Sequence, residues 1–120
     1  MSASTVHTMV RYEGEAAVID CLDVKLNEEL TIQAWGEELT NTVQNIGGYQ
    51  RVIVNFQNVK FMSSSALRVL ITLNQTARSR KLALFLCSIN PNILEVFKIT
   101  KLDSLFKIRA TEAEAVHSKL

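Results

Sequence analysis

Short apolar runs alternate with longer amphipathic segments along this chain, and the alternation constrains the fold more than any other feature. Residues 51–56 (RVIVNF) and 82–89 (LALFLCSI) are almost continuously apolar, which is typical of strands buried on both faces of a parallel or mixed sheet. The segments between such runs repeat apolar residues at helical spacing. Strands that alternate with helices in this way predict right-handed crossovers and an α/β fold.

The expected order of elements is β-β-α-β-α-β-α-β-α. The first two strands, residues 7–13 and 16–22, flank Gly14, which predicts a hairpin. Further strands are expected at residues 51–56, 82–89 and 104–108, and helices at residues 28–46, 64–80, 91–99 and 111–120. We predict one α/β domain over residues 1–120, with a four- to five-stranded mixed sheet and helices packed mainly on one face. Val54 and Leu84 should both be buried.

The first two helices can be predicted in more detail. Asn27 is the expected N-cap of the first, and Gly47-Gly48 ends it. In that helix the apolar positions at helical spacing are Leu30, Ala34, Trp35, Leu39, Val43 and Ile46. In the second helix, a turn of about 100° per residue predicts a core stripe of Ala66, Leu67, Leu70, Ile71 and Ala77. An outward stripe then contains Val69, Thr72, Leu73, Thr76 and Arg80, and we interpret it either as ordinary surface or as a docking face.

Composition and charge narrow the class of protein. With 120 residues, 48% of them hydrophobic, the chain is long enough to bury a core. No run approaches the roughly 18 apolar residues of a membrane span, and the N-terminus lacks the pattern of a signal peptide, so we expect a cytoplasmic protein without a membrane partner. Residues 1–50 carry a net negative charge and residues 51–110 a net positive charge. Either these charges largely cancel in the folded domain, or the basic half faces an acidic partner. No aromatic stripe accompanies the basic residues, so no nucleic-acid partner is predicted.

The residues that could support catalysis or bind a metal are sparse. Cys21 and Cys87 lie in apolar runs without a CxxC neighbour, which predicts buried, reduced thiols. His7 and His117 have no companion at ligand spacing, and we expect both at the surface, with no metal and no cofactor. A nucleophilic serine needs a base within hydrogen-bond reach, and neither GxxxxGK[ST] nor GxGxxG occurs. The sequence therefore indicates a protein that is not an enzyme.

Three consecutive serines, Ser63, Ser64 and Ser65, separate an apolar pair from the start of the second helix. One interpretation is a capping cluster, because a serine side chain accepts a hydrogen bond from a backbone N–H of the first turn. Another is that one hydroxyl receives a phosphoryl group. That group would place about −1.5 to −2 charges at the positive end of a helix dipole, with little change in the fold.

The segments VIVNFQNVKFMSSSALRVL and KLALFLCSINPNILEVFKITKLDSLFKI resemble the STAS domain of bacterial anti-sigma factor antagonists. In that family an apolar strand is followed by Phe-Met-Asp-Ser-Ser-Gly-Leu and a helix. The resemblance covers nearly the whole chain and is strongest in its second half. It implies a small α/β domain that binds an anti-sigma factor with serine kinase activity and thereby releases a sigma factor. It also implies that phosphorylation of the domain breaks the complex and that a serine phosphatase reverses this.

The resemblance also implies roles for particular residues. The phosphorylated serine of the family matches Ser64, and Asp23 matches the acidic residue that ends the family's second strand. Together with the outward stripe of the second helix, the implied partner surface comprises Asp23, Ser63, Ser64, Ser65, Arg68, Val69, Thr72 and Leu73. Ser63 and Ser65 are expected to cap the helix as small neighbours of Ser64.

Two positions depart from the family pattern. Ser63 stands where the motif has aspartate, and Ala66 where it has glycine. Alanine suits a helix better than glycine, so Ala66 is compatible with the fold. The two changes keep a second function open, in which a STAS domain that is not phosphorylated serves as a scaffold subunit of a sensory complex or as an accessory subunit of a transport machine.

Overall fold

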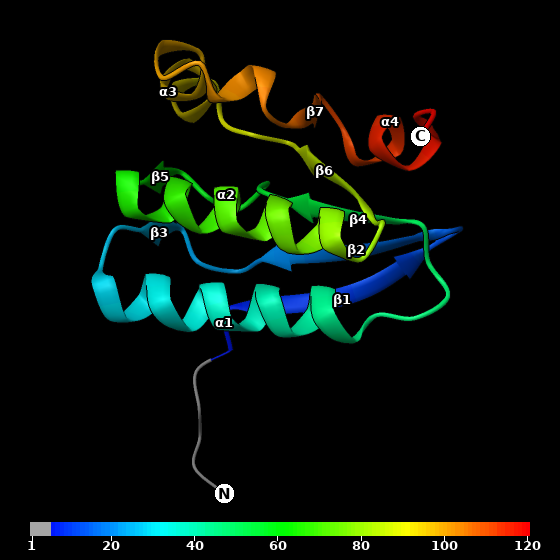
Figure 1. The fold of residues 1–120 in the computed structure, drawn as a ribbon. Coiled ribbons are helices and arrows are strands. Elements are labelled where there is room, and N and C mark those ends of the chain that lie inside the picture. The colour runs from blue at the N-terminus through cyan, green and yellow to red at the C-terminus, as the bar shows by residue number, and fades with distance from the viewer. Residues whose placement is uncertain (1–5) are drawn as a thin grey trace, which may run out of the picture.

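Five strands form one mixed sheet in a computed structural model that describes residues 6–120 (Figure 1). The strand order is β1-β2-β4-β6-β7. β1 and β2 form an antiparallel hairpin, and β2, β4, β6 and β7 run parallel to one another. Their bounds are β1 Thr8–Glu13, β2 Ala16–Cys21, β4 Arg51–Asn55, β6 Ala83–Cys87 and β7 Lys107–Arg109. The predicted hairpin and the inner positions of residues 51–56 and 82–89 are confirmed.

Helices cover both faces of this sheet, but unequally. α1 (Glu29–Asn45) and α2 (Ser64–Ser79) lie side by side on one face (Figure 1). With α3 (Pro91–Ile99) they enclose the larger core, which includes Trp35, Leu70 and Phe97. The short α4 (Glu112–His117) covers a small cluster on the other face, and a 3-10 turn, η1 (Leu102–Ser104), precedes β7. The predicted mixed sheet with helices mainly on one face is confirmed, and Val54 and Leu84 are buried.

Two short strands were missed from the sequence. β3 (Lys25–Leu26) and β5 (Phe61–Met62) pair in parallel as a separate two-stranded sheet beside the N-termini of α1 and α2. Two residues cannot show the alternation that identifies a strand in a sequence. The pairing holds the segment before α1 next to the segment before α2, and so brings two distant parts of the chain to one edge of the molecule.

The structure corrects the predicted boundaries and faces of both long helices. Glu28, not Asn27, is the N-cap of α1, and Leu30 remains 80% exposed. Leu73 is fully buried, so its place in the outward stripe was wrong. It follows Ala66 by seven residues, which is close to two full turns, and therefore shares the core face with Ala66 and Leu70. Ile71, expected in the core stripe, is only half-buried.

Both cysteines have buried free thiols, as predicted. Burial raises the pKa of the Cys21 thiol to about 12 and that of Cys87 to about 11. The Cys21 sulfur accepts a hydrogen bond from the Trp35 indole N–H, 3.3 Å away. No helix formed by residues 6–120 is long and apolar enough to cross a membrane.

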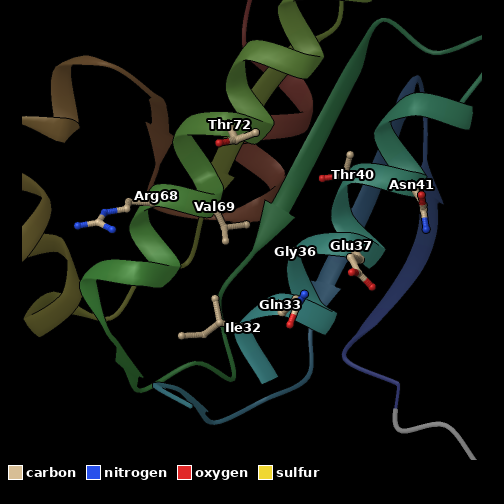
Figure 2. Close-up of a pocket in the computed structure, with 9 residues that line it drawn as sticks. All are labelled: Ile32, Gln33, Gly36, Glu37, Thr40, Asn41, Arg68, Val69 and Thr72. Carbon is tan, nitrogen blue, oxygen red and sulfur yellow. The ribbon is translucent and has the colours of Figure 1, made fainter. Parts of the chain in front are cut away.

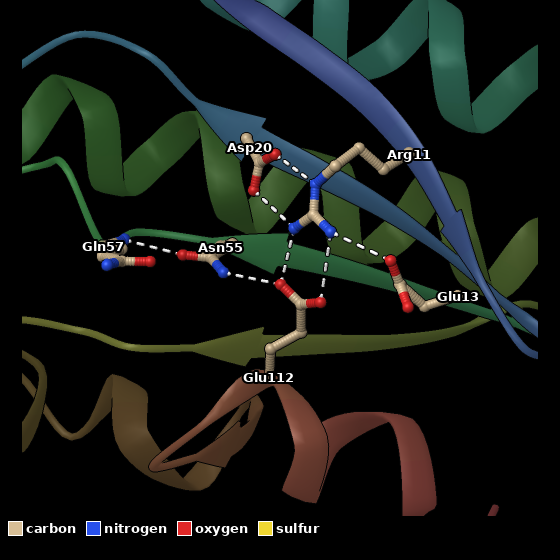
Figure 3. A network of polar contacts seen from close by, with 6 residues as sticks. All are labelled: Arg11, Glu13, Asp20, Asn55, Gln57 and Glu112. Atoms are coloured by element: carbon tan, nitrogen blue, oxygen red, sulfur yellow. Dashed lines mark hydrogen bonds and ion pairs between the residues drawn. The ribbon is translucent and has the colours of Figure 1, made fainter.

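A charged network fastens α4 to the sheet (Figure 3). The Arg11 guanidinium on β1 donates to both carboxylate oxygens of Asp20 on β2, at 2.6 and 2.9 Å. It also donates to Glu112 at the start of α4, with the shorter contact at 2.6 Å. Asn55 on β4 donates to the same Glu112 carboxylate at 2.9 Å. The hydrogen bonds from Arg11 lower the pKa of Glu112 below its ordinary value.

This network makes part of the stability depend on pH. Because the pKa of Glu112 is lowered in the folded state, its contribution is fully present above the unfolded value of about 4.3. The contribution is lost as the pH falls through the lower folded pKa. We expect Glu112→Gln to flatten the fall in unfolding free energy below about pH 4.5, as measured by urea denaturation at a series of pH values.

Glu114→Gln is the matched control, because Glu114 lies on the same helix and its side chain forms no ion pair within residues 6–120. This control should keep the pH slope of the parent protein. Identical slopes for Glu112→Gln and the parent would contradict the assignment.

Candidate functional site

The three serines lie where the chain passes from β5 into α2. The Ser63 N–H donates to the Leu26 carbonyl of β3 at 2.9 Å, which continues the β3–β5 pairing up to the helix. Ser64 is the first residue of α2, and both Ser64 and Ser65 are exposed. The sixteen-residue helix directs its unpaired N–H groups and its positive dipole end toward this edge. Ser64 is therefore accessible to another protein.

Ser63 occupies the N-cap position without acting as a cap. Its side chain makes no capping hydrogen bond, and its hydroxyl oxygen is buried with no hydrogen-bond partner among residues 6–120. The prediction that Ser63 caps the helix was therefore wrong. Asn90 and Thr111 do cap their helices, accepting from the N–H groups of Asn92 and Glu114 at 2.8 and 3.2 Å. In α2 the Ser63 hydroxyl is buried without making such a bond.

Asp23 lies on the segment that pairs with the chain just before the serines. The carbonyl of the next residue, Val24, accepts from the Lys60 N–H at 2.7 Å, which places the two segments side by side. The Asp23 carboxylate is 2.7 Å from His7 Nδ1. His7 is buried, so its expected surface position was wrong. Sequence spacing gave no sign of this pair, because sixteen residues separate its members.

Glu38 on α1 fixes the start of β1 next to this pair. Its carboxylate accepts from the backbone N–H of His7 and of Thr8, and also from the Thr8 hydroxyl at 2.7 Å. These contacts hold His7, and through it Asp23, against the body of the domain. The Asp23 carboxylate is thus oriented by its neighbours and only partly exposed.

Three residues of the predicted partner surface form one wall of a groove between α1 and α2 (Figure 2). Arg68, Val69 and Thr72 belong to α2. The groove has a volume of about 540 Å³, and the opposite wall on α1 is made by Ile32, Gln33, Gly36, Glu37, Thr40 and Asn41. Figure 2 shows Val69 directed toward α1 and Arg68 extending away from it. The outward stripe of α2 is therefore partly recessed.

Gly36 sets the depth of this groove. A Cβ atom at Gly36 would lie 3.1 Å from Val69 Cγ1, closer than ordinary packing allows. A glycine in a helix interior lowers helix stability, so its presence indicates a reason in packing. Gly36 was the sequence feature that indicated the α1 wall. It was missed because a search for apolar residues at helical spacing does not include glycine.

The site offers binding chemistry and little that would support catalysis. His117 belongs to α4 on the opposite face of the sheet, and within residues 6–120 the Ser63 hydroxyl has no hydrogen-bond partner, so no histidine is bonded to it as a base. In the described part of the chain, no three acidic, histidine or cysteine side chains are grouped as metal ligands would be. An exposed hydroxyl at a positive helix end is instead suited to accept a phosphoryl group.

Comparisons with known proteins agree on one family. The family model described as "STAS domain" matches residues 7–115. The "Putative anti-sigma factor antagonist BtrV" of Bordetella bronchiseptica is 32% identical over 113 residues, which cover 93% of each chain. Among solved structures, a STAS domain protein from Planctomyces limnophilus superposes with a TM-score of 0.79 at 20% identity, covering 94% of this chain and 97% of the other. A "putative anti-sigma factor antagonist" from Thermotoga maritima gives 0.75 at 20% identity and 91% coverage of both chains.

The unsatisfied Ser63 hydroxyl leads to a prediction about stability. Removing a serine N-cap usually costs about 0.5 to 2 kcal/mol. Ser63 makes no capping bond, and its buried oxygen lacks a partner in the described part of the chain, so Ser63→Ala should leave the unfolding free energy unchanged or raise it. Asn90→Ala, which removes a real cap, should lower it by about 1 kcal/mol. Urea denaturation of both variants provides the comparison, and equal losses would show that Ser63 does cap α2.

Proposed function

The chain belongs to the STAS domain family, and we propose on this basis that it is an anti-sigma factor antagonist, which binds an anti-sigma factor with serine kinase activity and so releases a sigma factor. The proposal rests chiefly on Ser64, which is exposed at the N-terminus of α2 where the family has its phosphorylated serine. Phosphorylation of Ser64 is the proposed switch, and a serine phosphatase reverses it.

The energetics of this position support a switch. The helix end favours negative charge, so the free domain tolerates a phosphoryl group on Ser64. In a complex built around a neutral hydroxyl, the same dianion would be desolvated and unpaired. A penalty of about 3 kcal/mol on the complex would change its affinity more than a hundredfold.

The proposed partner surface is the one expected from the sequence, with one residue removed. It comprises Asp23, Ser63, Ser64, Ser65, Arg68, Val69 and Thr72. Leu73 is excluded because its side chain is fully buried. Val24, Leu30 and Phe61 are large exposed apolar side chains on the segments beside the serines, and they extend this surface. Apolar side chains beside small polar ones are typical of a protein interface.

A second function is favoured by two specific residues. Ser63 and Ala66 replace the aspartate and glycine of the family motif, and the loss of the aspartate removes a charge beside the acceptor hydroxyl. A domain that binds without being phosphorylated would serve as a scaffold subunit of a sensory complex or as an accessory subunit of a transport machine. The two functions differ in the fate of Ser64.

The switch is tested by Ser64 variants and by a kinase assay. The Ser64→Asp variant should bind the kinase that co-purifies with this protein more weakly than the parent does. The Ser64→Ala variant should bind this kinase constitutively. Incubation of the parent protein with that kinase and ATP, followed by mass spectrometry, should locate phosphate on Ser64. Phosphate found only on Ser63 or Ser65 would overturn the proposed switch at Ser64. A complex that forms without any phosphorylation would also overturn it and would favour the scaffold function.

The surface is tested by a pair of substitutions on α2. Val69→Lys should weaken the complex and shift the melting temperature by less than about 4 °C, because the Val69 side chain is only half-buried. Leu73→Lys should unfold the domain, since it buries a charge in the core. Thermal denaturation and isothermal titration of each variant separate the two effects. A large loss of stability in Val69→Lys would show that Val69 belongs to the core.

A further inference from the structure

β1 is a terminal strand of the sheet, and its outer edge has no strand partner among residues 6–120. The hydrogen bonds to β2 show which of its backbone groups face outward. The Leu22 N–H donates to the His7 carbonyl at 3.0 Å, and the β1–β2 register continues from this pair. In an antiparallel ladder, residues that exchange hydrogen bonds with the neighbouring strand alternate with residues that do not. Val10 and Tyr12 therefore direct their N–H and C=O groups away from β2.

This edge has few of the features that usually prevent pairing with another strand. Proteins protect edge strands with proline, lysine, bulges or a covering segment. β1 has six residues, contains neither proline nor lysine, and keeps an unbroken register with β2. Its first residue is covered, because the Thr8 N–H donates to the Glu38 carboxylate of α1 at 2.8 Å. The part of the edge from Val10 to Glu13 is open to a further strand.

A hollow lies beside the open edge, on the face of the sheet that α1 covers. It has a volume of about 260 Å³ between β1, the last turns of α1 and the segment before β4. Val10 and Tyr12 line it from the strand, and Ile46 and Tyr49 line it from the segment after α1. Tyr12 stacks on Tyr49 and is still 57% exposed. Because side chains alternate between the faces of a strand, a strand added to β1 would direct every second side chain toward this hollow.

The opposite face of the same edge is acidic. Three carboxylates, those of Glu13, Asp20 and Glu112, surround Arg11 there, with contacts of 2.6 to 3.3 Å to its guanidinium (Figure 3). One positive charge against three negative charges leaves this network net negative. Glu13 belongs to the open part of β1, and its side chain is 52% exposed. Basic side chains on this face of an added strand would therefore be attracted to it.

We propose that the outer edge of β1 binds an extended segment of another protein, in which apolar and basic residues alternate, as a further strand of the sheet. The backbone of the segment pairs with Val10 and Tyr12, its apolar side chains enter the hollow, and its basic side chains face Glu13. In such strand addition, backbone bonds supply affinity and alternate side chains supply specificity. A second copy of β1 is disfavoured as the added strand, because antiparallel pairing would place two net negative networks on one face. The site uses neither Ser64 nor the groove between α1 and α2.

The proposal is tested by titrating the isotope-labelled full chain with an acetylated and amidated hexapeptide of alternating arginine and valine, followed by backbone amide NMR. Saturable shifts should centre on β1, and the N–H groups of Val10 and Tyr12 should exchange more slowly with solvent in the complex. The Arg11 N–H faces β2 and should keep its exchange rate. No saturable binding, shifts centred elsewhere, or unchanged exchange at Val10 and Tyr12 would overturn the proposal.

Two pairs of variants separate the backbone contribution from the charge contribution. Tyr12→Pro removes one outward N–H, and the β1–β2 ladder does not use that N–H. It should bind the peptide about tenfold more weakly than Tyr12→Val, which keeps the N–H, as expected for the loss of about one hydrogen bond. Glu13→Lys should also weaken binding by about tenfold. Glu95→Lys makes the same charge change at an exposed position on α3 and should bind as the parent does.

Two further peptides test the pattern of the segment. A hexapeptide of alternating glutamate and valine has the opposite charge, and one of three arginines followed by three valines has the same composition without the alternation. Both should bind more weakly than the alternating arginine–valine peptide. Equal affinity for either control peptide, equal binding by Tyr12→Pro and Tyr12→Val, or equal binding by Glu13→Lys and Glu95→Lys would contradict the assignment.

Discussion

The rest of the structure depends on the burial of the parallel strands β4 and β6 on both faces. A parallel strand can be followed by another only through a crossover, and right-handed crossovers place α1 and α2 together on one face. All the parallel strands then end at the same edge of the sheet. The segments that follow β2 and β4 meet there as the β3–β5 pair, which leads directly into the serines. The location of the candidate site is thus a consequence of how the core is covered.

Covering the second face is the harder requirement, and the chain meets it with few residues. α4 has only six residues, and its buried apolar contribution is chiefly Ala115, which packs with Phe85 and Ile53. Such a short helix has little intrinsic stability. Its attachment relies on polar contacts from the sheet, including the bond of 2.7 Å from Arg51 to the Ala115 carbonyl. The two faces are therefore held by different kinds of interaction, one apolar and one largely ionic.

Sequence patterns predicted the features that depend on local periodicity. Strands such as residues 51–56 and 82–89 follow from neighbouring residues, and the structure confirms them. Features that depend on distant residues were missed. The Asp23–His7 pair joins two strand ends, and the α1 wall of the groove exists because Gly36 meets Val69 from another helix. Leu73 is a different case, because helical spacing alone places it on the core face and the assignment was simply wrong.

The hydrogen bond between Trp35 and the Cys21 sulfur has a practical consequence. Trp35 is the only tryptophan of the chain, and both it and the free thiol are sealed in the main core. A buried thiol with a strongly raised pKa reacts slowly, so Cys21 becomes reactive when the core around it opens. The rate of alkylation at Cys21 therefore measures how often this part of the core opens in the native protein. The Cys21 thiol is therefore an intrinsic probe of this opening.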